Sequence, residues 1–460
     1  MRFSAMRYEK PLTQFAGYPG FSDILMRQDT LVFRFPNRFR CAGLARNLFV
    51  CPSSIKPPNP LGTMRNPIFI LGIFLGLHLV SSPVCAQTKT DAHIHIGTTD
   101  TLYSEVYGRH RTFFVHTPSV TPDPDRPFPV LYVLDGDQFF ISVVGMVDQM
   151  SRACGGTTLP PMIVVGIPHR NRIRELPPRP DSDQAHQLHT FFELELIPYV
   201  EQKYHASSFR TLYGHSLGGL FVIQTLLERH DLFDQYLAID PSLWWDDRYL
   251  MQRCQSEWAQ LDLSGKSLFL GIADTKPSGI TFDSLAKMPD TGQEIAHPQA
   301  LWAFQELVHS SPNGLHFQYE FYEGDTHSSC VAPSQLDGIR FLFDWYDGDQ
   351  ILQRISNPEG DGTQLLEELD NHYRYVSRKM RYPIFAPADK MIRFSRFLAS
   401  HDLMDRALAI LNLTARYYPD NPGVFQTIGW FYEMQNDDLN ARAAYRQADD
   451  LRQIPSVGNQ

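Results

Sequence analysis

The fold is decided by the stretch Phe209-Arg210-Thr211-Leu212-Tyr213-Gly214-His215-Ser216-Leu217-Gly218-Gly219. A short apolar strand, expected over residues 209–213, runs here directly into an apolar helix expected over residues 217–230. Gly214 and Gly218 stand two residues before and two residues after Ser216, and a strand-to-helix turn this sharp requires small residues at both places. The pattern predicts that Ser216 sits exposed on a tight turn, which is the geometry of a nucleophilic serine.

Apolar strands alternate with helices on both sides of this turn. Strands are expected over residues 128–134, 162–167, 236–239, 267–272 and 317–322, and a further helix over residues 191–204. Such alternation is typical of a mainly parallel sheet whose two faces are covered by helices. The sequence therefore predicts the α/β class, with a doubly wound, mainly parallel sheet of the α/β-hydrolase type over residues 90–350.

A serine hydroxyl needs a general base, and in this kind of fold the base comes after the serine in the chain. Five histidines lie downstream: His230, His297, His309, His316 and His327. Only His327 follows a predicted strand and lies in a polar loop, residues 323–329. His327 is therefore predicted to accept the proton of Ser216.

The carboxylate that orients this histidine is expected at the end of the preceding strand. The predicted strand over residues 267–272 runs into Asp274, which is the first choice. Asp290, in a later loop, is the second choice, and Asp283 is the third. The sequence leaves the three open.

Two backbone N–H groups are predicted to form an oxyanion hole. One belongs to Leu217, the residue after the nucleophile, and the other to a loop that follows an earlier strand. The turn after residue 134 fits this second place, since Gly136 lets the backbone approach a substrate and Asp137 follows it. Leu217 and Asp137 are the predicted donors.

One metal-like motif precedes the first predicted strands. Asp91, His93 and His95 resemble the first metal motif of amidohydrolases, which requires further histidine and aspartate ligands on later strands. No matching sequence follows, and the same residues read as ordinary strand alternation. No metal site is predicted.

The beginning of the chain has the pattern of an export signal. Residues 64–86 comprise a short basic start, an apolar run over residues 67–80 and the small-residue exit Val84-Cys85-Ala86. We expect a signal peptide that is cleaved near Gln87; lipid attachment at Cys85 and an uncleaved anchor are the alternatives. Residues 1–63, which carry nine Lys and Arg against three Asp and Glu, then read as a misassigned extension. The prediction is a periplasmic or secreted protein.

Charge and cysteine content narrow the class further. The net charge of −10 argues against general nucleic-acid binding, which needs a basic surface. After the predicted signal, only Cys154, Cys254 and Cys330 remain. An odd and widely spaced set predicts neither a disulfide framework nor a zinc site, although one disulfide could form.

The character of the chain changes after Trp345, where no strand is evident and a helical region is expected over residues 360–455. Two segments of 34 residues, 388–421 and 422–455, place large and small side chains at the spacing of tetratricopeptide repeats. The positions are Met391, Phe394, Ser395, Leu398, Ala407, Leu411 and Thr414 in the first segment, and Phe425, Ile428, Gly429, Tyr432, Ala441, Tyr445 and Ala448 in the second. Such repeats predict a protein partner.

Several ordered strings add to the nucleophile turn. They are residues 108–118, Tyr132-Val133-Leu134-Asp135-Gly136-Asp137, Val164-Val165-Gly166-Ile167, residues 172–176, residues 196–201, Asp240-Pro241-Ser242-Leu243-Trp244-Trp245 and Tyr322-Glu323-Gly324-Asp325-Thr326-His327-Ser328-Ser329. Over residues 94–346 the chain resembles the family of esterases that includes enterochelin esterases and esterase D.

The resemblance implies an α/β-hydrolase fold, hydrolysis of carboxylic esters, and no metal or organic cofactor. Ser216 and His327 fall on the nucleophile and base positions of the family. The family commonly has Glu where this chain has Asp274, so the chain departs from the family pattern at this position. Trp244 and Trp245 match a segment near the mouth of the active site and are expected to line an acyl or aromatic pocket, with plain packing as the alternative.

The expected function is that of an exported serine esterase that works through an acyl-enzyme intermediate. Acyl transfer to an acceptor other than water uses the same residues and is an alternative. A repeat-mediated interaction module on a hydrolase platform is another. The expected substrate is a small-molecule or polymer-linked ester, such as a siderophore lactone, an acylated polysaccharide or a small acyl ester, and a membrane is met only during export.

Overall fold

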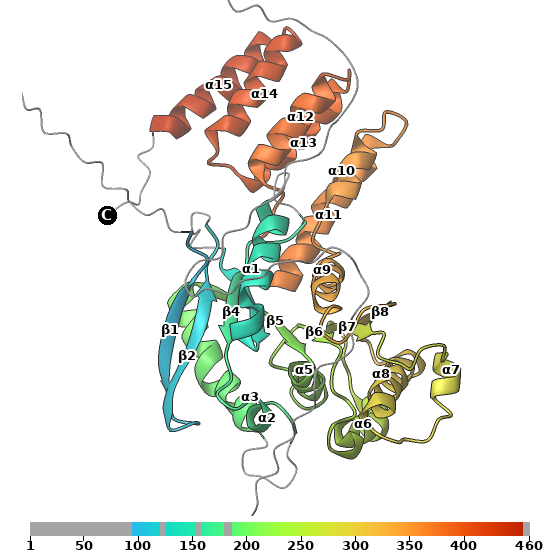
Figure 1. Cartoon of the computed structure of the whole chain (residues 1–460). Coiled ribbons are helices and arrows are strands. Elements are labelled where there is room, and N and C mark those ends of the chain that lie inside the picture. Colours follow the sequence, from blue (N-terminus) through green and yellow to red (C-terminus); the bar gives the residue numbers. More distant parts are fainter. Residues whose placement is uncertain (1–93, 120–125, 153–157, 179–185, 454–460) are drawn as a thin grey trace, which may run out of the picture. The chain divides into compact units, whose positions relative to one another are not determined.

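The computed structural model describes residues 94–119, 126–152, 158–178 and 186–453 (Figure 1). Its centre is an eight-stranded sheet in the order β1-β2-β4-β3-β5-β6-β7-β8. The strands are β1 (Thr98–Ser104), β2 (Arg109–His116), β3 (Phe128–Leu134), β4 (Ile163–Ile167), β5 (Ala206–His215), β6 (Gln235–Ile239), β7 (Ser267–Ala273) and β8 (His316–Tyr322). The predicted α/β class and mainly parallel sheet are confirmed.

The central strands of this sheet are more buried than the strands at its two edges. Strands β4, β6 and β7 are buried along their whole length, as expected for strands covered on both faces. Strand β8 and the outer strand β1 instead alternate between more and less exposed residues, since they lie at the edges. Strands β1 and β2 form an antiparallel hairpin, β2 pairs antiparallel with β4, and the remaining pairs are parallel.

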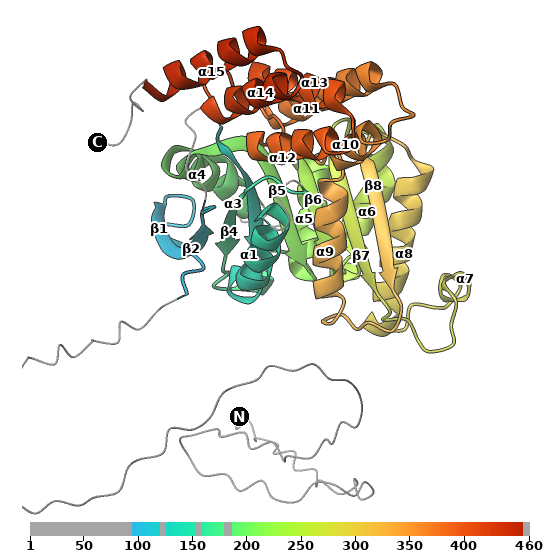
Figure 2. The ribbon, with the colours of Figure 1, turned by 90° about the horizontal axis from the view of Figure 1, so that it is seen from above.

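Helices cover both faces of the sheet (Figures 1 and 2). On one face lie α1 (Gly136–Arg152) and α9 (Val331–Leu342), and on the other lie α3 (Gln187–Phe191), α4 (Ile197–Tyr204), α5 (Leu217–Glu228), α6 (Trp245–Glu257) and α8 (Gln293–Ser310). A π-helical turn, Phe192–Leu196, joins α3 to α4. The short helices α2 (Arg172–Glu175) and α7 (Phe282–Leu285) lie in loops, and a 3₁₀ turn, Trp258–Gln260, follows α6.

The strand order places a crevice next to Ser216. From β3 the chain passes through α1 to β4 on one side, and β5 then returns to the other side of β3. Open α/β sheets bind ligands at the carboxyl ends of strands where the order reverses in this way. Asp135 follows β3 and Ser216 follows β5, so both residues lie at this switch point.

The region after Phe343 is helical, as predicted. It comprises α10 (Asp349–Ile355), α11 (Gly362–Met380), α12 (Ala388–Ala399), α13 (Met404–Tyr417), α14 (Pro422–Met434) and α15 (Asp438–Gln453). Helices α12 and α13 fall in the first predicted repeat, and α14 and α15 in the second. Their assignment as tetratricopeptide repeats, and the domain boundaries, stay predictions.

Arg381, at the end of α11, joins this region to the sheet. Its Nη1 donates to the Ser208 carbonyl oxygen at 2.7 Å and to Asp234 Oδ2 at 3.2 Å. Ser208 is near the start of β5 and Asp234 directly precedes β6. These contacts therefore lie at the amino ends of β5 and β6, whereas the Ser216 turn lies at their carboxyl ends.

Several predictions concern the beginning of the chain and the cysteines. The expected extension (1–63), the signal peptide (64–86), Asp91 and His93 lie outside the described residues, as does Cys154. Cys254 and Cys330 are buried free thiols. Over the ranges that the structure describes, none of the helices has the length and apolar character needed to cross a membrane.

A buried ion cluster ties α2 to the β1–β2 hairpin. Glu175 contacts Arg111 Nη1 at 3.0 Å, Arg109 Nη2 at 3.1 Å and His169 Nδ1 at 3.2 Å. Burial raises the pKa of the Glu175 carboxyl, but the hydrogen bond from His169 and the charge of Arg111 outweigh it and lower the pKa to about 2. A carboxyl whose pKa falls on folding stabilises the fold above its unfolded pKa, and this contribution is lost as the pH falls through the folded value.

Replacing Glu175 with Gln should lower the free energy of unfolding at neutral pH by about 3 kcal/mol, because it leaves the buried Arg111 without a carboxylate. Urea denaturation measures this difference. Since wild-type Glu175 itself becomes protonated in acid, the difference from wild type should shrink between about pH 4.5 and pH 2. Glu105→Gln, at an exposed position after β1, is the matched control. A destabilisation that is equally large at both ends of this range would contradict the role of the charge.

Candidate active site

Ser216 lies on a strained turn between β5 and α5. Its backbone has φ 60° and ψ −117°, a conformation that non-glycine residues adopt only where the surrounding structure holds them. A side chain at Gly214 would overlap the carbonyl group of Gly218, so this turn can form only with glycine at that position. The predicted strand-to-helix turn around Ser216 is present.

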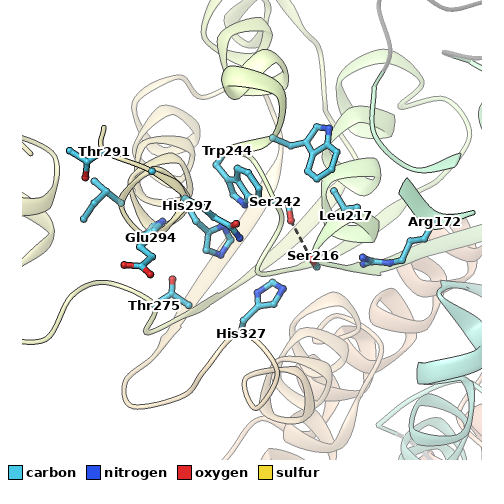
Figure 3. Close-up of a pocket in the computed structure, with 15 residues that line it drawn as sticks. Arg172, Ser216, Leu217, Ser242, Trp244, Thr275, Thr291, Glu294, His297 and His327 are labelled. Atoms are coloured by element: carbon cyan, nitrogen blue, oxygen red, sulfur yellow. Dashed lines mark hydrogen bonds between the residues drawn. The ribbon is translucent and has the colours of Figure 1, made fainter. Parts of the chain in front are cut away.

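Ser216 opens onto a cavity of about 990 Å³ at the carboxyl edge of the sheet (Figure 3). The cavity is lined by residues that follow five strands and by the start of α8: Arg172, Ser216, Leu217, Ser242, Trp244, Trp245, Thr275, Thr291, Gly292, Gln293, Glu294, Ile295, His297, Pro298 and His327. Ser216, Leu217, His327, Trp244 and Trp245 were predicted site residues, and the structure brings all five to this cavity.

His327 is held in the cavity by three contacts. Its ring Nδ1 lies 2.5 Å from Asp240 Oδ2, and its carbonyl oxygen accepts hydrogen bonds from His215 Nε2 at 2.8 Å and from Cys330 Sγ at 3.5 Å. Because Asp240 is an acceptor, Nδ1 carries the proton in this contact and Nε2 keeps its lone pair. The imidazole thus has the free nitrogen lone pair that a general base requires.

His215 holds the backbone of His327 in place. Burial lowers the pKa of His215 to about 4, and the neighbouring His327 contributes to the shift. The ring of His215 is therefore neutral at neutral pH, and its Nε2–H donates to the His327 carbonyl. The two ring centroids are 4.5 Å apart. His215 fixes the loop that carries His327 without adding charge to the cavity.

Asp240 directly follows β6 and is fully buried. Its Oδ2 accepts from both His327 Nδ1 at 2.5 Å and His297 Nε2 at 2.9 Å, and its Oδ1 accepts from the Ala273 N–H at 2.9 Å. Burial raises the pKa of this carboxyl, but the hydrogen bonds from His297, His327 and Ala273 outweigh it and hold the pKa well below its usual range. Asp240 is therefore an ionised carboxylate throughout the physiological pH range.

The expectation that Asp274 contacts His327 is wrong. Asp274 Oδ1 pairs with Lys276 at 2.8 Å, and its Oδ2 accepts from the Gly324 N–H at 3.2 Å, so both oxygens are engaged away from the histidine. The second choice, Asp290, pairs with Arg248 at 2.8 Å, and Asp283 lies in the short helix α7. The physical reason is that the His327 ring reaches back across the sheet to the end of β6 and does not meet the end of the adjacent β7.

His297, in the first turns of α8, is a second histidine on the same carboxylate. Its Nε2 must carry the proton that it donates to Asp240, which leaves Nδ1 as a bare acceptor. That Nδ1 is buried and has no hydrogen-bond partner among the described residues. The His297 and His327 rings meet edge to face with centroids 5.6 Å apart. Asp240 is thus shared between two imidazoles on the cavity wall.

The Ser216 hydroxyl hydrogen-bonds to Ser242 at an Oγ–Oγ distance of 3.2 Å, and the Ser242 N–H donates to the Ser216 carbonyl oxygen at 3.0 Å (Figure 3). Between the described atoms of Ser216 and His327 there is no direct hydrogen bond. Hydrogen bonds of this kind are often loose in unliganded sites and form when a substrate binds. A rotation about the Ser216 χ1 angle moves Oγ without moving the turn.

The two predicted oxyanion donors differ in their placement. Leu217 lines the cavity beside Ser216, whereas Asp137 is exposed in the first turn of α1 and is not among the described residues that line the cavity. Glycine is required at position 136 because a side chain there would collide with the backbone of Gly166 in β4. Gly136 therefore serves the packing of α1 on the sheet.

Arg172 occupies the place where the second donor was expected. Its Nε donates to Asp135 Oδ1 at 2.8 Å and its Nη2 to the His215 carbonyl oxygen at 3.0 Å. Asp135 is 2% exposed, so this carboxylate is a firm support for the guanidinium. Figure 3 shows the guanidinium of Arg172 directed toward Ser216. A fixed positive charge thus lies at the rim of the cavity beside the nucleophile turn.

The residues of this site also contain a possible metal-ligand set. One ligand atom each from Asp240, His297 and His327 lies within 4.8 Å of the others. Both imidazoles, however, point a proton-bearing nitrogen at the same carboxylate oxygen, at 2.9 and 2.5 Å. A metal ligand must offer a lone pair, so this geometry is that of a hydrogen-bonded network.

Sequence reasoning missed Asp240, His297 and Arg172 as site residues. The signal for Asp240 was present, because Asp240 follows the predicted strand 236–239 in the same way that Asp274 follows its own strand. His297 follows no predicted strand, and no local pattern in the sequence distinguishes a histidine that faces a buried carboxylate. Arg172 appeared only within a string of the resemblance, and only the fold places it beside Ser216.

Comparisons with known proteins agree with this architecture. The family described as "Putative esterase" matches residues 104–274. The ferri-bacillibactin esterase BesA of Bacillus subtilis is 27% identical over 247 residues, which are 48% of this chain and 81% of that protein. The siderophore enterobactin esterase of Emericella nidulans is 28% identical over 164 residues, 30% of this chain and 52% of that protein.

Two solved structures have the same fold. The IroE-like serine hydrolase from Shewanella oneidensis aligns with a TM-score of 0.56 and 24% identity, over 70% of this chain and 99% of that one. A protein from Capnocytophaga ochracea aligns with a TM-score of 0.58 and 16% identity, over 76% of this chain and 93% of that one. The family match over residues 104–274 and the similar proteins named as esterases support an esterase of the α/β-hydrolase fold that acts on ester bonds.

Proposed function

We propose that this protein is an exported serine esterase in which Ser216 is the nucleophile, His327 the general base and Asp240 the acid that orients His327. One observation carries the proposal. The Ser216 turn and the His327 ring line one cavity, and the ring nitrogen that cannot serve as base is hydrogen-bonded to a buried carboxylate. Serine hydrolases require this order of contacts.

In the first half of the reaction, Ser216 Oγ attacks the ester carbonyl carbon while its proton passes to His327 Nε2. The C=O π bond opens to an oxyanion, and the imidazolium that forms is stabilised by the Asp240 carboxylate. Collapse of this intermediate breaks the bond to the alcohol oxygen, which takes the proton from His327. The products are an acyl-Ser216 ester and the free alcohol.

In the second half, water attacks the acyl carbon and His327 Nε2 takes its proton. The tetrahedral intermediate collapses, the bond to Ser216 Oγ breaks, and the proton on His327 returns to that oxygen. The carboxylic acid leaves and the starting enzyme is restored. No oxidant, reductant or cofactor takes part in either half.

The oxyanion is stabilised by the Leu217 N–H and by the Arg172 guanidinium. Arg172→Met keeps an unbranched apolar stem and removes the charge, so kcat should fall about 10- to 100-fold while KM changes little. Arg172→Lys should recover part of the loss, and Arg174→Met, at an exposed position of the same helix α2, should behave as wild type. The three variants are compared in steady-state ester hydrolysis with Tm measured alongside. A wild-type kcat in a folded Arg172→Met protein would remove Arg172 from the site.

The size and lining of the cavity favour a bulky ester with aromatic groups. At about 990 Å³ the cavity lies at the upper end of small-molecule sites, and the Trp244 and Trp245 rings, with centroids 5.7 Å apart, offer flat apolar walls. The relatives named as esterases of bacillibactin and enterobactin act on siderophores. We therefore propose a siderophore-type polyester as the substrate class.

Hydrolysis assays test this function directly. Purified protein is incubated with a tricatecholate trilactone, free and iron-loaded, with p-nitrophenyl butyrate and with an acetylated polysaccharide, and the released acid is measured. We expect kcat/KM for the trilactone to exceed that for p-nitrophenyl butyrate, and Ser216→Ala to abolish both activities. A preference for the acetylated polysaccharide would refute the substrate class, and no turnover of any ester would refute the esterase proposal.

Export is the remaining part of the proposal, and its support is the sequence pattern of residues 64–86. N-terminal sequencing of the protein recovered from the periplasm or medium should give a chain that starts near Gln87. A chain that retains residues 1–63 would contradict both the signal peptide and the misassigned start.

A further inference from the structure

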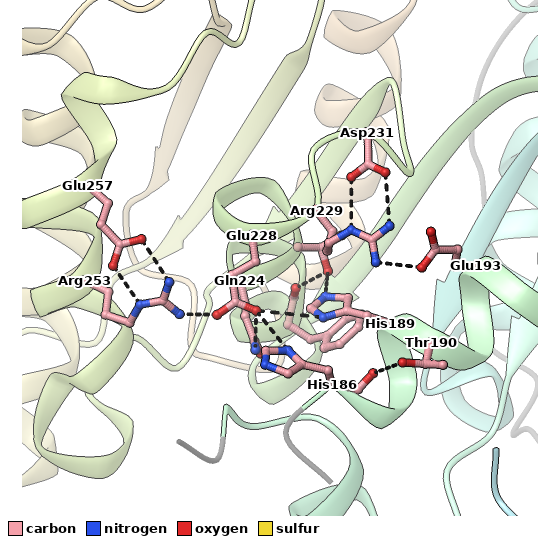
Figure 4. Close-up of polar contacts among 12 residues, drawn as sticks. His186, His189, Thr190, Glu193, Gln224, Glu228, Arg229, Asp231, Arg253 and Glu257 are labelled. Atoms are coloured by element: carbon pink, nitrogen blue, oxygen red, sulfur yellow. Dashed lines mark hydrogen bonds and ion pairs between the residues drawn. The ribbon is translucent and has the colours of Figure 1, made fainter. Parts of the chain in front are cut away.

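A second cavity, of about 670 Å³, lies between α3, α5 and α6 and has no described lining residue in common with the first. It is lined by Pro178, His186, His189, Gln224, Leu227, Glu228, Arg229, Tyr249, Arg253 and Glu257. Figure 4 shows His186, His189 and Glu228 converging at one point of this cavity. Two histidines three residues apart and a carboxylate on a facing helix are a common ligand set for transition metals.

The proton on His189 can be placed from its contacts. Thr225 Oγ1 donates its hydrogen to the Phe221 carbonyl oxygen at 2.7 Å, so it can only accept from His189 Nε2, which lies 2.9 Å away. Nε2 therefore carries the ring proton and Nδ1 bears the lone pair. A ligating histidine is oriented in this way by a hydrogen bond from its other nitrogen.

The lone pair of His189 faces another acceptor. Nδ1 is buried without a hydrogen-bond partner among the described residues, the side chain is 1% exposed, and Nδ1 lies 3.9 Å from Glu228 Oε2. Two acceptors that face each other in a buried site repel unless a cation lies between them.

His186 completes the set from the rim of the cavity. Its Nδ1 lies 3.7 Å from Glu228 Oε2, and one ligand atom from each of the three residues lies within 4.8 Å of the others. Ligands around a tetrahedral Zn²⁺ at about 2.0–2.2 Å stand about 3.4 Å apart. The His186 side chain is 70% exposed, so it can rotate to bring its ring nitrogen to this distance from the other two ligand atoms.

The charges around the cavity also favour a dication. Arg253 pairs with both Glu228 and Glu257, and Arg229 pairs with both Glu193 and Asp231 (Figure 4). Two guanidinium groups thus pair with four carboxylates. The cluster therefore has a net charge of two negative charges when the histidines are neutral. Arg253 and Gln224 also fix the orientation of Glu228, as hydrogen bonds to a ligating carboxylate do.

We propose that His186, His189 and Glu228 bind one divalent transition-metal ion of the Zn²⁺ class, with water at the fourth position. Imidazole nitrogen and carboxylate oxygen are the ligands that Zn²⁺ accepts. The ion links the start of α3 to the last turn of α5, the helix that begins directly after Ser216. Its role is to hold these two helices together, and it takes no part in ester hydrolysis.

Metal binding by tag-free protein tests this site. The protein is stripped with EDTA, and Zn²⁺ binding is measured by calorimetry and by elemental analysis after dialysis. Compared with wild type, His186→Ala and Glu228→Gln should each weaken binding by at least about 10-fold and remove one bound ion per chain. Co²⁺ should give a visible d–d spectrum of tetrahedral type that is lost in both variants. Zn²⁺ should raise the Tm of wild type but not that of His186→Ala.

Control variants distinguish this site from metal binding elsewhere on the protein. His110→Ala removes an exposed histidine of β2 and should bind as wild type. An ion held instead by Asp240, His297 and His327 would persist in His186→Ala and disappear in His297→Ala, which would overturn the proposal. Equal binding by wild type and His186→Ala, or none by wild type, would overturn it as well. Ester hydrolysis by His186→Ala should match wild type, so the test is independent of the proposed esterase mechanism.

Discussion

Replacing Asp240 with Asn should lower kcat for ester hydrolysis about 10,000-fold with little change in KM. If the new amide presents its NH₂ group to His327, the ring must accept at Nδ1 and protonate Nε2, so it cannot take the Ser216 proton. If it presents its oxygen instead, the NH₂ group faces the Ala273 N–H, which now donates to Asp240 Oδ1 at 2.9 Å. Either orientation also removes the charge that stabilises the imidazolium. Steady-state kinetics on an activated ester measure the effect.

Asp274→Asn is the matched control, since Asp274 lies after the neighbouring strand and pairs with Lys276. Its kcat should stay within about 3-fold of wild type, because its removal leaves the His327 contact intact. Circular dichroism and Tm of both variants establish that the fold is retained. An active Asp240→Asn enzyme, or an inactive but folded Asp274→Asn enzyme, would reverse the assignment of the acid.

Ser216→Ala should lower kcat by about five to six orders of magnitude, because no other group replaces the attacking oxygen. The cavity holds a useful control in Ser242, whose hydroxyl lies 3.2 Å from that of Ser216 but whose backbone is not on the strained turn. Ser242→Ala should lose less than about 10-fold, since it removes one neutral hydrogen bond. Equal losses in both variants would mean that the two hydroxyls act as a unit.

The centre of the fold could be predicted from the sequence, because buried parallel strands are continuous apolar runs. The strand predicted over residues 128–134 is β3 residue for residue, and those predicted over 236–239 and 267–272 differ from β6 and β7 by a single residue each. The hairpin of β1 and β2 was not predicted as a pair of strands. Its exposed positions carry polar side chains, and its buried ones are too few to form an apolar run.

The site was predictable only in part. Ser216 and Leu217 follow from local geometry, and His327 follows from its place in a polar loop after a predicted strand, since each depends on residues close to it in the sequence. The partner of His327 could not be chosen in this way. Asp240 and Asp274 each follow a predicted strand, and the difference between them is a side-chain direction across the sheet that only the packed structure fixes.

The position of Arg172 could not be predicted from the sequence either, because it depends on residues far away in the chain. Its place beside Ser216 depends on Asp135, 37 residues earlier, and on the buried cluster around Glu175 that anchors α2 to the hairpin. The sequence offered Asp137 as the donor at this point because Asp137 follows a glycine after a strand. In the structure Gly136 instead allows α1 to pack closely against β4. The positive charge beside Ser216 comes from the side chain of Arg172, which is distant in the sequence.

The central claim, that Ser216 is the nucleophile activated by His327, is tested most directly by covalent labelling. A fluorophosphonate reacts with the activated serine of a serine hydrolase and leaves a stable phosphonyl ester, which peptide mass spectrometry locates. We predict one adduct per chain, on Ser216, formed less than about 10-fold more slowly in Asp274→Asn and Ser242→Ala and slowed far more in His327→Ala and Asp240→Asn. An adduct on Ser242, or no adduct on Ser216 in the folded wild-type protein, would contradict the account.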